Sequence, residues 1–337
     1  MTLLKVNNLK VHFPVRTGIF GRIQGHVRAV DDISFKIRRG ETLGLVGESG
    51  SGKTTVGRTI LRGIEPTEGQ IFFNRNGNNI ELTKIEGEEL RKFRQHMQMI
   101  FQDPYASLNP RMTVRDIIAE PLVASGLARG KTLDARVREG AARCKLNLEY
   151  LRRFPHAFSG GQRQRISIAR AIVSNPEFIV CDESVSALDV SVQAEILNLL
   201  MDLQKELKTT YLFIAHDLSV VAHISHRVAV MYMGILVELA PTEDLFFSPK
   251  HPYTEALLSA IPEANPDHQM KPVSLKGEIP DVINPPGGCR FHTRCNYARD
   301  KCKEEIPGWQ EMEKEHFVAC HFAHELLLTG AMTNAGS

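Results

Sequence analysis

The sequence predicts an α/β protein built on a mostly parallel β-sheet, with antiparallel strands at its N-terminal end, an inserted helical subdomain and a small cysteine-rich C-terminal region. Two observations predict the core. Near residue 46 an apolar, strand-like run meets a glycine-rich turn and then a helix-compatible run. Between residues 178 and 215 two short apolar strands flank a long amphipathic helix. Strand, helix and strand in this order are typical of parallel strands joined by crossover helices.

Length and composition fit one large domain with a smaller appendage. The chain has 337 residues, of which 42% are hydrophobic and 24% charged, so it can bury a sizeable core. Its net charge of +2 gives no reason to expect a nucleic-acid partner. No apolar run approaches the ~18 residues that a membrane span needs, and residues 1–13 lack the form of a signal peptide. We therefore expect a cytoplasmic protein that reaches a membrane only through a partner.

The first hundred residues alternate between strands and helices. Residues 2–13 and 29–37 alternate in part between apolar and polar side chains, as half-buried antiparallel strands do. The stretch between them, residues 14–27, contains several Gly and Arg and predicts a long hairpin loop. After the glycine-rich turn we expect a helix at 53–61, a turn at 65–69, a strand at 70–74, a charged helix at 86–96 and a strand at 97–101.

The pattern is helical from 113 to 175. Thr113 is expected to cap a helix through Ser125 and Thr132 one through Leu146, and residues 159–174 form a third. Strands follow at 178–181 and 211–215 around a helix at 190–207, and then a hairpin at 227–240. Beyond about Ser259 the chain becomes rich in Pro, Gly and Cys. We therefore expect one domain at 1–258, with its helical subdomain at about 110–175, and a second at 259–337 that ends in a flexible tail.

The glycine-rich turn has the form G-x-x-x-x-G-K-[ST], which binds nucleotide phosphates. Glycines turn backbone N–H groups inward on an anion, and the helix behind them adds a positive partial charge. The alternative is a Gly/Ser turn that merely precedes a helix, but the strand and helix on either side favour the phosphate site. Lys53 would reach the β- and γ-phosphates, and the Thr54 hydroxyl would ligate Mg²⁺. The candidate ATP-binding residues of this phosphate loop are Gly47, Glu48, Ser49, Gly50, Ser51, Gly52, Lys53, Thr54 and Thr55.

Two carboxylates, Asp182 and Glu183, follow the apolar strand at 178–181. Ligands bind at the carboxyl ends of parallel strands, so Asp182 is expected beside Mg²⁺ and Glu183 beside the attacking water. Two acids at a strand end are otherwise an ordinary solvated terminus, but the phosphate loop upstream favours the catalytic interpretation.

Residues 158–165, Phe-Ser-Gly-Gly-Gln-Arg-Gln-Arg, contain a Ser-Gly-Gly turn at a helix start, which is a second anion site. Here the chain resembles the ATP-binding subunits of ABC transporters, and the resemblance covers roughly residues 3–260. It implies an ABC ATPase with the RecA-like core of P-loop NTPases. In that family the signature of one subunit closes over the γ-phosphate bound by another. The residues that match the signature are Ser159, Gly160, Gly161 and Gln162.

Further positions match the family one at a time. Gln102 resembles the Q-loop glutamine, which contacts Mg²⁺ and the water and lies where the transmembrane partner docks. His216 resembles the switch histidine at the γ-phosphate, although a lone His at a strand end is more often structural. The adenine-stacking residue is assigned to Phe13, with Phe20 and His26 as alternatives. The D-loop, which crosses the dimer interface, is matched by Ser186, Ala187, Leu188 and Asp189. Together these residues imply direct attack of water on the γ-phosphate of ATP.

The C-terminal region resembles that of ATPases of dipeptide and oligopeptide importers, whose relatives serve nickel, opines and glutathione. The matching stretches are residues 251–259 (His-Pro-Tyr-Thr-Glu-Ala-Leu-Leu-Ser), 288–295 (Gly-Cys-Arg-Phe-His-Thr-Arg-Cys) and 103–110 (Asp-Pro-Tyr-Ala-Ser-Leu-Asn-Pro). The resemblance implies a second ABC ATPase subunit, two transmembrane permeases and an extracytoplasmic solute-binding protein. We expect a heterodimer of ATPases at the cytoplasmic face of the membrane, with a homodimer as the alternative.

Four of the six cysteines, Cys289, Cys295, Cys302 and Cys320, fall near the C-terminus, whereas Cys144 and Cys181 lie singly and are expected to be buried thiols. In a reducing cytosol such clustering favours metal ligation over disulfides. Four thiolates suit a [4Fe–4S] cluster or Zn²⁺, and unligated thiols are the third possibility. The resembled group carries an iron–sulfur cluster in this region, which favours the cluster. The nearby histidines are expected to be ordinary surface residues: His292, His316 and His321.

Two other classes of protein compete with a transporter ATPase. A soluble ABC-type ATPase of DNA repair or translation predicts a long coiled-coil insertion or two tandem cassettes, and neither is present. A non-hydrolytic regulatory subunit predicts a lost catalytic acid or a broken signature, but Glu183 and residues 159–162 are intact.

Overall fold

The central sheet is mostly parallel, as the sequence predicts. The structure is a computed structural model, and it describes residues 1–17, 22–261 and 273–331. Within these residues the central sheet has the strand order β11-β12-β10-β9-β3-β8-β7-β6, and the strands from β9 to β6 run parallel. Its strands are β3 (Thr42–Val46), β6 (Met97–Ile100), β7 (Phe178–Asp182), β8 (Thr210–Ile214), β9 (Arg227–Tyr232), β10 (Ile235–Pro241), β11 (Gln310–Glu313) and β12 (His316–Val318).

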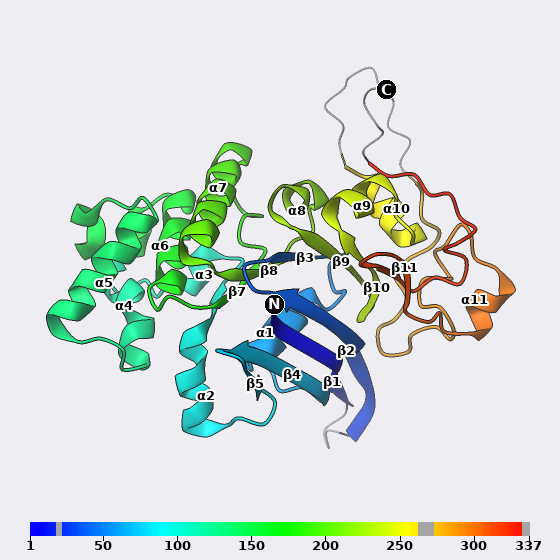
Figure 1. Cartoon of the computed structure of the whole chain (residues 1–337), viewed down its shortest axis with the longest axis horizontal. Helices are drawn as coiled ribbons and strands as arrows, with labels where there is room; N and C mark the ends of the chain where they lie inside the picture. Colours follow the sequence, from blue (N-terminus) through cyan, green and yellow to red (C-terminus); the bar gives the residue numbers. More distant parts are fainter. Residues whose placement is uncertain (18–21, 262–272, 332–337) are drawn as a thin grey trace.

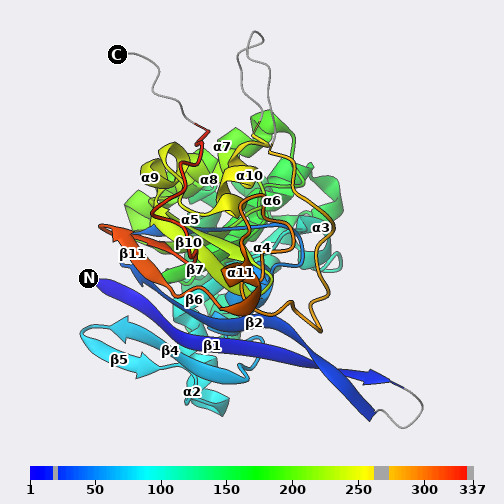
Figure 2. The same ribbon diagram turned by 90° about the vertical axis from the view of Figure 1, so that its right-hand side faces the viewer.

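A second, antiparallel sheet has the order β2-β1-β4-β5. Its strands are β1 (Thr2–Thr17), β2 (Arg22–Arg38), β4 (Glu68–Arg75) and β5 (Asn78–Glu81). Figure 2 shows the paired ends of β1 and β2 extending beyond the rest of the molecule. The expectation of a loop at residues 14–27 was wrong, because both strands continue through most of this stretch. Main-chain pairing satisfies the polar backbone groups there, which the local Gly and Arg content does not reveal.

The helices cover both faces of the central sheet (Figure 1). Alternate side chains of β7 enter different cores: Phe178 and Val180 pack with α1 and the antiparallel sheet, whereas Ile179 and Cys181 pack toward the large helices. The helices are α1 (Lys53–Ile60), α2 (Gly87–Phe93), η1 (Arg94–His96), α3 (Pro104–Ser107), α4 (Val114–Ala124), α5 (Gly130–Arg143), η2 (Leu148–Arg152), η3 (Pro155–Ala157), α6 (Gly160–Ile172), α7 (Val190–Leu207), α8 (Leu218–Ile224), α9 (Thr242–Phe247), α10 (Pro252–Leu258) and α11 (Asp300–Glu304).

Helix starts were predicted well where the capping residue has a partner. Thr113 and Ser159 cap α4 and α6, and Ser159 forms a full capping box with Gln162. Thr132 does not cap α5, because this helix already begins at Gly130. In the described part of the chain no helix is sufficiently long and apolar to span a bilayer.

The C-terminal region adds strands to the central sheet, which the sequence did not predict. Residues of β12 pair with β10, and β11 pairs with β12. Most of the expected tail at 329–337 lies outside the described residues. Its first part is attached, since the N–H of Thr329 donates to Glu255 and that of Ala331 to the carbonyl of Phe246.

Candidate functional site

The phosphate loop connects β3 to α1, as predicted. Two of its glycines have backbone conformations that residues with a side chain rarely adopt: φ is +151° at Gly47 and +104° at Gly52. A Cβ at Gly52 would lie 2.0 Å from the carbonyl oxygen of Ala29, and one at Gly47 would lie 2.1 Å from that of Met231. The loop therefore follows the neighbouring strands β2 and β9 too closely for any side chain at these positions.

Lys53 is buried beneath the loop. Its Nζ donates to the carbonyl oxygens of Gly47 and Glu48, both at 2.8 Å. Burial lowers the pKa of Lys53, while Glu183, Asp182 and Glu48 act in the opposite direction. The ammonium thus lies under the anion site and bonds to groups that it can exchange for phosphate oxygens.

The side chains expected to hold Mg²⁺ meet at the end of β7. The Thr54 hydroxyl donates to Asp182 Oδ1 at 2.8 Å, and Asp182 is almost fully buried. Burial raises the pKa of Asp182, and the Thr54 hydrogen bond acts against this rise. A hydroxyl and a carboxylate are hard oxygen donors of the kind that Mg²⁺ prefers, so the pair fits this ion.

Two further side chains, those of Gln102 and His216, approach the same carboxylate oxygen of Glu183. Gln102 Nε2 donates to Glu183 Oε2 at 2.7 Å, and His216 Nδ1 lies 3.4 Å from the same oxygen. The three residues follow β6, β7 and β8, whose carboxyl ends are adjacent in the parallel sheet. Glu183 has a φ of +44°, and its N–H donates to the carbonyl of Ile214. The chain turns sharply here and directs this carboxylate away from the strand.

The signature and the D-loop lie together, apart from the phosphate loop. A Cβ at Gly161 would lie 2.5 Å from Val192 on α7, and one at Gly160 would contact Leu188 of the D-loop. The predicted D-loop is attached to the backbone of Glu183, since the Ser186 hydroxyl donates to the carbonyl of Glu183 at 2.9 Å. Among the described residues no hydrogen bond or ion pair joins residues 159–162 to residues 47–55. The residues predicted for the signature and those predicted for the phosphate loop therefore lie in separate parts of the described chain.

The residue that stacks on adenine stays a prediction. Phe13 lies on β1 opposite Val27 and is 40% exposed. The alternative His26 pairs with Pro14 on the same hairpin, and Phe20 lies outside the described residues.

Three of the four C-terminal thiols, Cys289, Cys295 and Cys320, have a pKa that neighbouring thiols help to raise. Burial, followed by smaller effects from the other three, raises the pKa of Cys289 to about 12, and that of Cys320 rises to about 11. Backbone N–H groups of Phe291, Tyr297 and Phe322 oppose the rise at Cys289, Cys295 and Cys320. However, in the ranges that the structure describes, no three His, Cys, Asp or Glu side chains are close enough together to hold a metal ion.

The remaining cysteine and histidine expectations had mixed outcomes. Cys144 and Cys181 are fully buried, as predicted, and burial raises the pKa of both thiols. The expectation of a surface residue was wrong for His316, which is 1% exposed and lies 2.7 Å from the buried Glu238. Glu238 also accepts the N–H groups of Lys250 and His251, so this carboxylate joins β12 to the start of α10.

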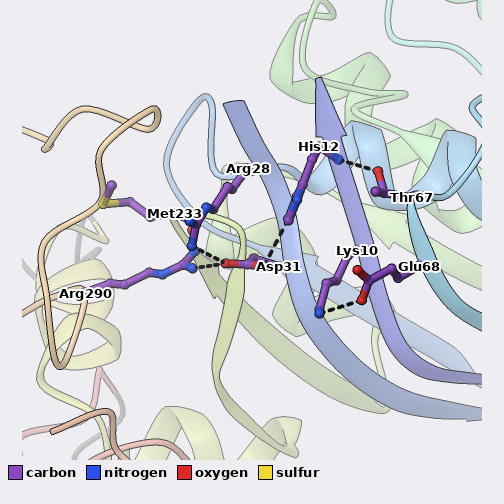
Figure 3. A network of polar contacts seen from close by, with 8 residues as sticks. All are labelled: Lys10, His12, Arg28, Asp31, Thr67, Glu68, Met233 and Arg290. Carbon is purple, nitrogen blue, oxygen red and sulfur yellow. Dashed lines mark hydrogen bonds and ion pairs between the residues drawn. The ribbon is translucent and has the colours of Figure 1, made fainter. Parts of the chain in front are cut away.

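Sequence reasoning missed the contacts between the C-terminal region and the nucleotide-binding core. Figure 3 shows Arg290 bonded to Asp31 on β2 and to the carbonyl of Met233, with His12 on the other side of Asp31. Burial acts to raise the pKa of Asp31, but Arg290 and His12 outweigh it and keep this pKa below its ordinary value. Arg294 makes a similar ion pair with Glu48 of the phosphate loop. No local pattern indicates such pairs, because their members are more than 240 residues apart.

Comparisons with known proteins agree with this geometry. The family described as "ABC transporter" matches residues 30–186, and "Oligopeptide/dipeptide transporter, C-terminal region" matches residues 237–302. The oligopeptide transport ATP-binding protein AppF of Bacillus subtilis is 51% identical, over 95% of this chain and 97% of that protein. A putative peptide import ATP-binding protein of Brucella ovis is 48% identical, over 94% of this chain and 97% of that protein.

Solved structures give the same result for the fold. The dimeric, post-hydrolysis ATP-binding cassette MJ0796 with ADP and Pi has a TM-score of 0.61 and 27% identity, and the match covers 71% of this chain and 99% of that one. CbiO1 of Clostridium perfringens, part of an ABC transporter complex, has a TM-score of 0.61 and 26% identity, and the match covers 73% of this chain and 90% of that one. Fold and site therefore define an ATP hydrolase of the ATP-binding-cassette class. The chain belongs to the ABC transporter ATP-binding proteins that carry the oligopeptide/dipeptide transporter C-terminal region.

Proposed function

We propose that this protein is the ATP-hydrolysing subunit of an ABC importer that takes up dipeptides, oligopeptides or related small solutes. The observation that carries the hydrolytic part is the meeting of Gln102 and His216 on Glu183, next to the Thr54–Asp182 pair. Support for the solute class comes from the C-terminal match at residues 237–302 and from relatives named as peptide transport proteins.

In the proposed reaction Glu183 orients the attacking water and accepts its proton. Gln102 and His216 fix the carboxylate before ATP binds, and His216 then turns to the γ-phosphate. Lys53 exchanges its bonds to the Gly47 and Glu48 carbonyls for phosphate oxygens. Thr54 and Asp182 would hold Mg²⁺, which supplies charge neutralisation at the phosphates when bound. The site has no covalent intermediate, so positioning and electrostatic stabilisation account for catalysis.

The site needs a second ATPase subunit, because the signature of this chain lies apart from its own phosphate loop. A partner's signature serine and glycines would close over the γ-phosphate, as Ser159, Gly160 and Gly161 of this chain would do for the partner. The capping box at Ser159 keeps the start of α6 formed while it awaits that phosphate. We propose a heterodimer, in which the partner is a different ATPase of the same class.

Two transmembrane permeases are the proposed membrane partners, with an extracytoplasmic protein delivering the solute. A cavity of about 660 Å³ lies between the end of α1, the strand β6 and the helix α4. Its wall includes Phe101, which is 38% exposed and directly precedes Gln102. The centre of the Phe101 ring lies 5.7 Å from Cζ of Arg170. A permease helix seated there would press on the residue that bonds to Glu183. The chain would thereby sit at the cytoplasmic face of the membrane.

For the C-terminal region we propose a [4Fe–4S] cluster on Cys289, Cys295, Cys302 and Cys320, with Zn²⁺ as the alternative. Support comes from the donor set of four neighbouring thiols, since backbone N–H groups oppose the rise in the pKa of three of them and such groups stabilise a ligating thiolate. The thiols would have to come closer together than they are in this structure to hold one ion or cluster. We assign the cluster no step in ATP hydrolysis. We also propose that the chain has two domains, the ATPase domain at residues 1–258 and the cysteine-rich domain at residues 259–337.

Co-purification and uptake test the proposed function. The full chain, expressed with permeases and a second ATPase, is expected to purify as one complex and to drive ATP-dependent peptide uptake into vesicles that contain the permeases. Hydrolysis of ATP by the chain with no retained permease would favour a soluble ABC-type ATPase. Metal analysis of the anaerobically purified chain distinguishes iron from zinc and from unligated thiols.

A further inference from the structure

Glu48, a residue of the phosphate loop, is held at two points by Tyr253 of α10 and by Arg294 of the cysteine-rich region. Arg294 donates from Nη1 and Nη2 to the two carboxylate oxygens of Glu48, at 2.6 and 3.0 Å. The Tyr253 hydroxyl accepts the backbone N–H of Glu48 at 2.8 Å. Both the side chain and the main chain of one loop residue therefore depend on residues more than 200 positions further along the sequence.

The groups that reach Glu48 are themselves fixed by packing. Tyr253 is fully buried and Arg294 is 7% exposed. Phe291 packs against Tyr232 and Tyr253, with ring centroids 5.2 and 5.3 Å apart. The N–H of Arg294 donates to the carbonyl of Phe291, so the guanidinium extends from a short turn anchored in this aromatic cluster. Because the guanidinium forms two parallel hydrogen bonds and is itself fixed by packing, it sets both the position and the orientation of the Glu48 carboxylate.

The charge of Glu48 makes this attachment relevant to nucleotide binding. A carboxylate in a loop that binds a polyphosphate repels the ligand unless a cation neutralises it. Glu48 also acts electrostatically on Lys53, whose ammonium bonds to the Glu48 carbonyl. Without Arg294, the free carboxylate would compete with phosphate for Lys53 and would no longer be held outside the anion site.

We propose that Arg294 is a positioning residue for ATP binding: it neutralises and orients Glu48, so the phosphate loop has its binding shape only while the cysteine-bearing segment at residues 289–295 is docked. This inference rests on the proposed ATP site. Because Cys289 and Cys295 flank the segment, a change at these two residues reaches the phosphate loop through Arg294.

The test measures the Kd for Mg-ATP and the steady-state hydrolysis of the full chain in its complex. Arg294→Gln is expected to raise Kd and KM about tenfold while kcat changes less than about threefold, since the interaction acts on binding. Arg294→Lys keeps the positive charge but not the two-point hydrogen bonding, so its Kd and KM are expected to lie between those of the unaltered chain and those of Arg294→Gln. The double variant Glu48→Gln with Arg294→Gln removes both charges and is expected to regain most of the affinity, within about threefold of the unaltered chain.

Arg299→Gln is the matched control, because it removes a positive charge from the same region at a residue paired with Glu325. Its Kd is expected to stay unchanged. Unchanged affinity in Arg294→Gln would overturn the proposal. So would a double variant that melts at the unaltered temperature yet binds as weakly as the single one, since Arg294 would then act through packing. Failure of the unaltered chain to bind ATP would instead overturn the proposed ATP site.

Discussion

The ATP site and the cysteine region contrast in how their functional side chains are held. Each residue proposed for catalysis at the ATP site follows a strand of the parallel sheet, so the spacing of β6, β7 and β8 fixes Gln102, Glu183 and His216. The cysteine region has little regular structure: α11 has five residues and β12 has three. Its thiols are neighbours, but among the described residues no three His, Cys, Asp or Glu side chains are grouped closely enough to hold a metal ion. A sheet organises a site without its ligand, whereas an irregular segment relies on the ligand for its final shape.

The largest effect is expected at the carboxylate. Glu183→Gln keeps the shape of the side chain but removes the proton acceptor, so kcat for ATP hydrolysis is expected to fall about 10²- to 10³-fold. The Kd for Mg-ATP is expected to change less than about threefold, because the residue lies at the water and not at the phosphate loop. Phosphate release and equilibrium binding measure the two quantities.

Glu195→Gln is the control for this substitution, since Glu195 is an exposed carboxylate on α7 that pairs with Arg165. Hydrolysis at the unaltered rate by the Glu183 variant would remove the assigned role and leave the sheet-edge arrangement as a structural feature only.

The second effect concerns the backbone of the ATP site. Gly52→Ala places a Cβ 2.0 Å from the carbonyl oxygen of Ala29 in a backbone with positive φ. The loop must deform, and the Kd for Mg-ATP is expected to rise about 100-fold or more. Gly40→Ala is matched in conformation, since Gly40 has a φ of +74° with nothing near its Cβ. It should cost about 1 kcal/mol of stability and leave ATP affinity unchanged. Equal losses of affinity in both variants would contradict a local steric role for Gly52.

The sequence predicted where the candidate ATP-site residues lie in the fold, because their motifs are short and stand at fixed places on strands and helices. Their roles in binding and catalysis stay predictions. The loop after β3, the acids after β7 and the helix start near residue 159 each follow from a few adjacent residues. Contacts between distant segments were not predictable in this way. The pairs Arg294–Glu48 and Glu238–His316 have ordinary residues at both ends, and only the folded chain brings them together. Local composition also misled at residues 14–27, where pairing with the opposite strand outweighs the Gly content.

The third effect tests the cysteine region. Cys302→Ser removes one of four thiols, so bound iron is expected to fall from about four per chain to nearly none. Because residues 289–295 contact Glu48 through Arg294, the Kd for ATP is expected to rise about three- to tenfold. Iron analysis, visible absorption and nucleotide binding measure these outcomes. Cys144→Ala, at a buried thiol remote from the cluster of four, is the control and should keep its iron. Full iron content in the Cys302 variant would exclude this residue as a ligand.

The smallest effect concerns His251, which joins the two regions at the start of α10. Its Nδ1 accepts the N–H of Tyr253, and burial lowers its pKa to about 3. Because the folded pKa lies below the unfolded value of about 6.5, neutral His251 contributes stability above pH 6.5 that is progressively lost as pH falls toward 3. Between pH 7 and 5.5 the unfolding free energy should fall by about 1 kcal/mol more than in His251→Asn, which keeps a capping acceptor but cannot titrate. Denaturant unfolding at both pH values measures this difference. Identical pH dependence in the two proteins would show that His251 can be protonated in the fold, and hence that the contact between the regions opens easily.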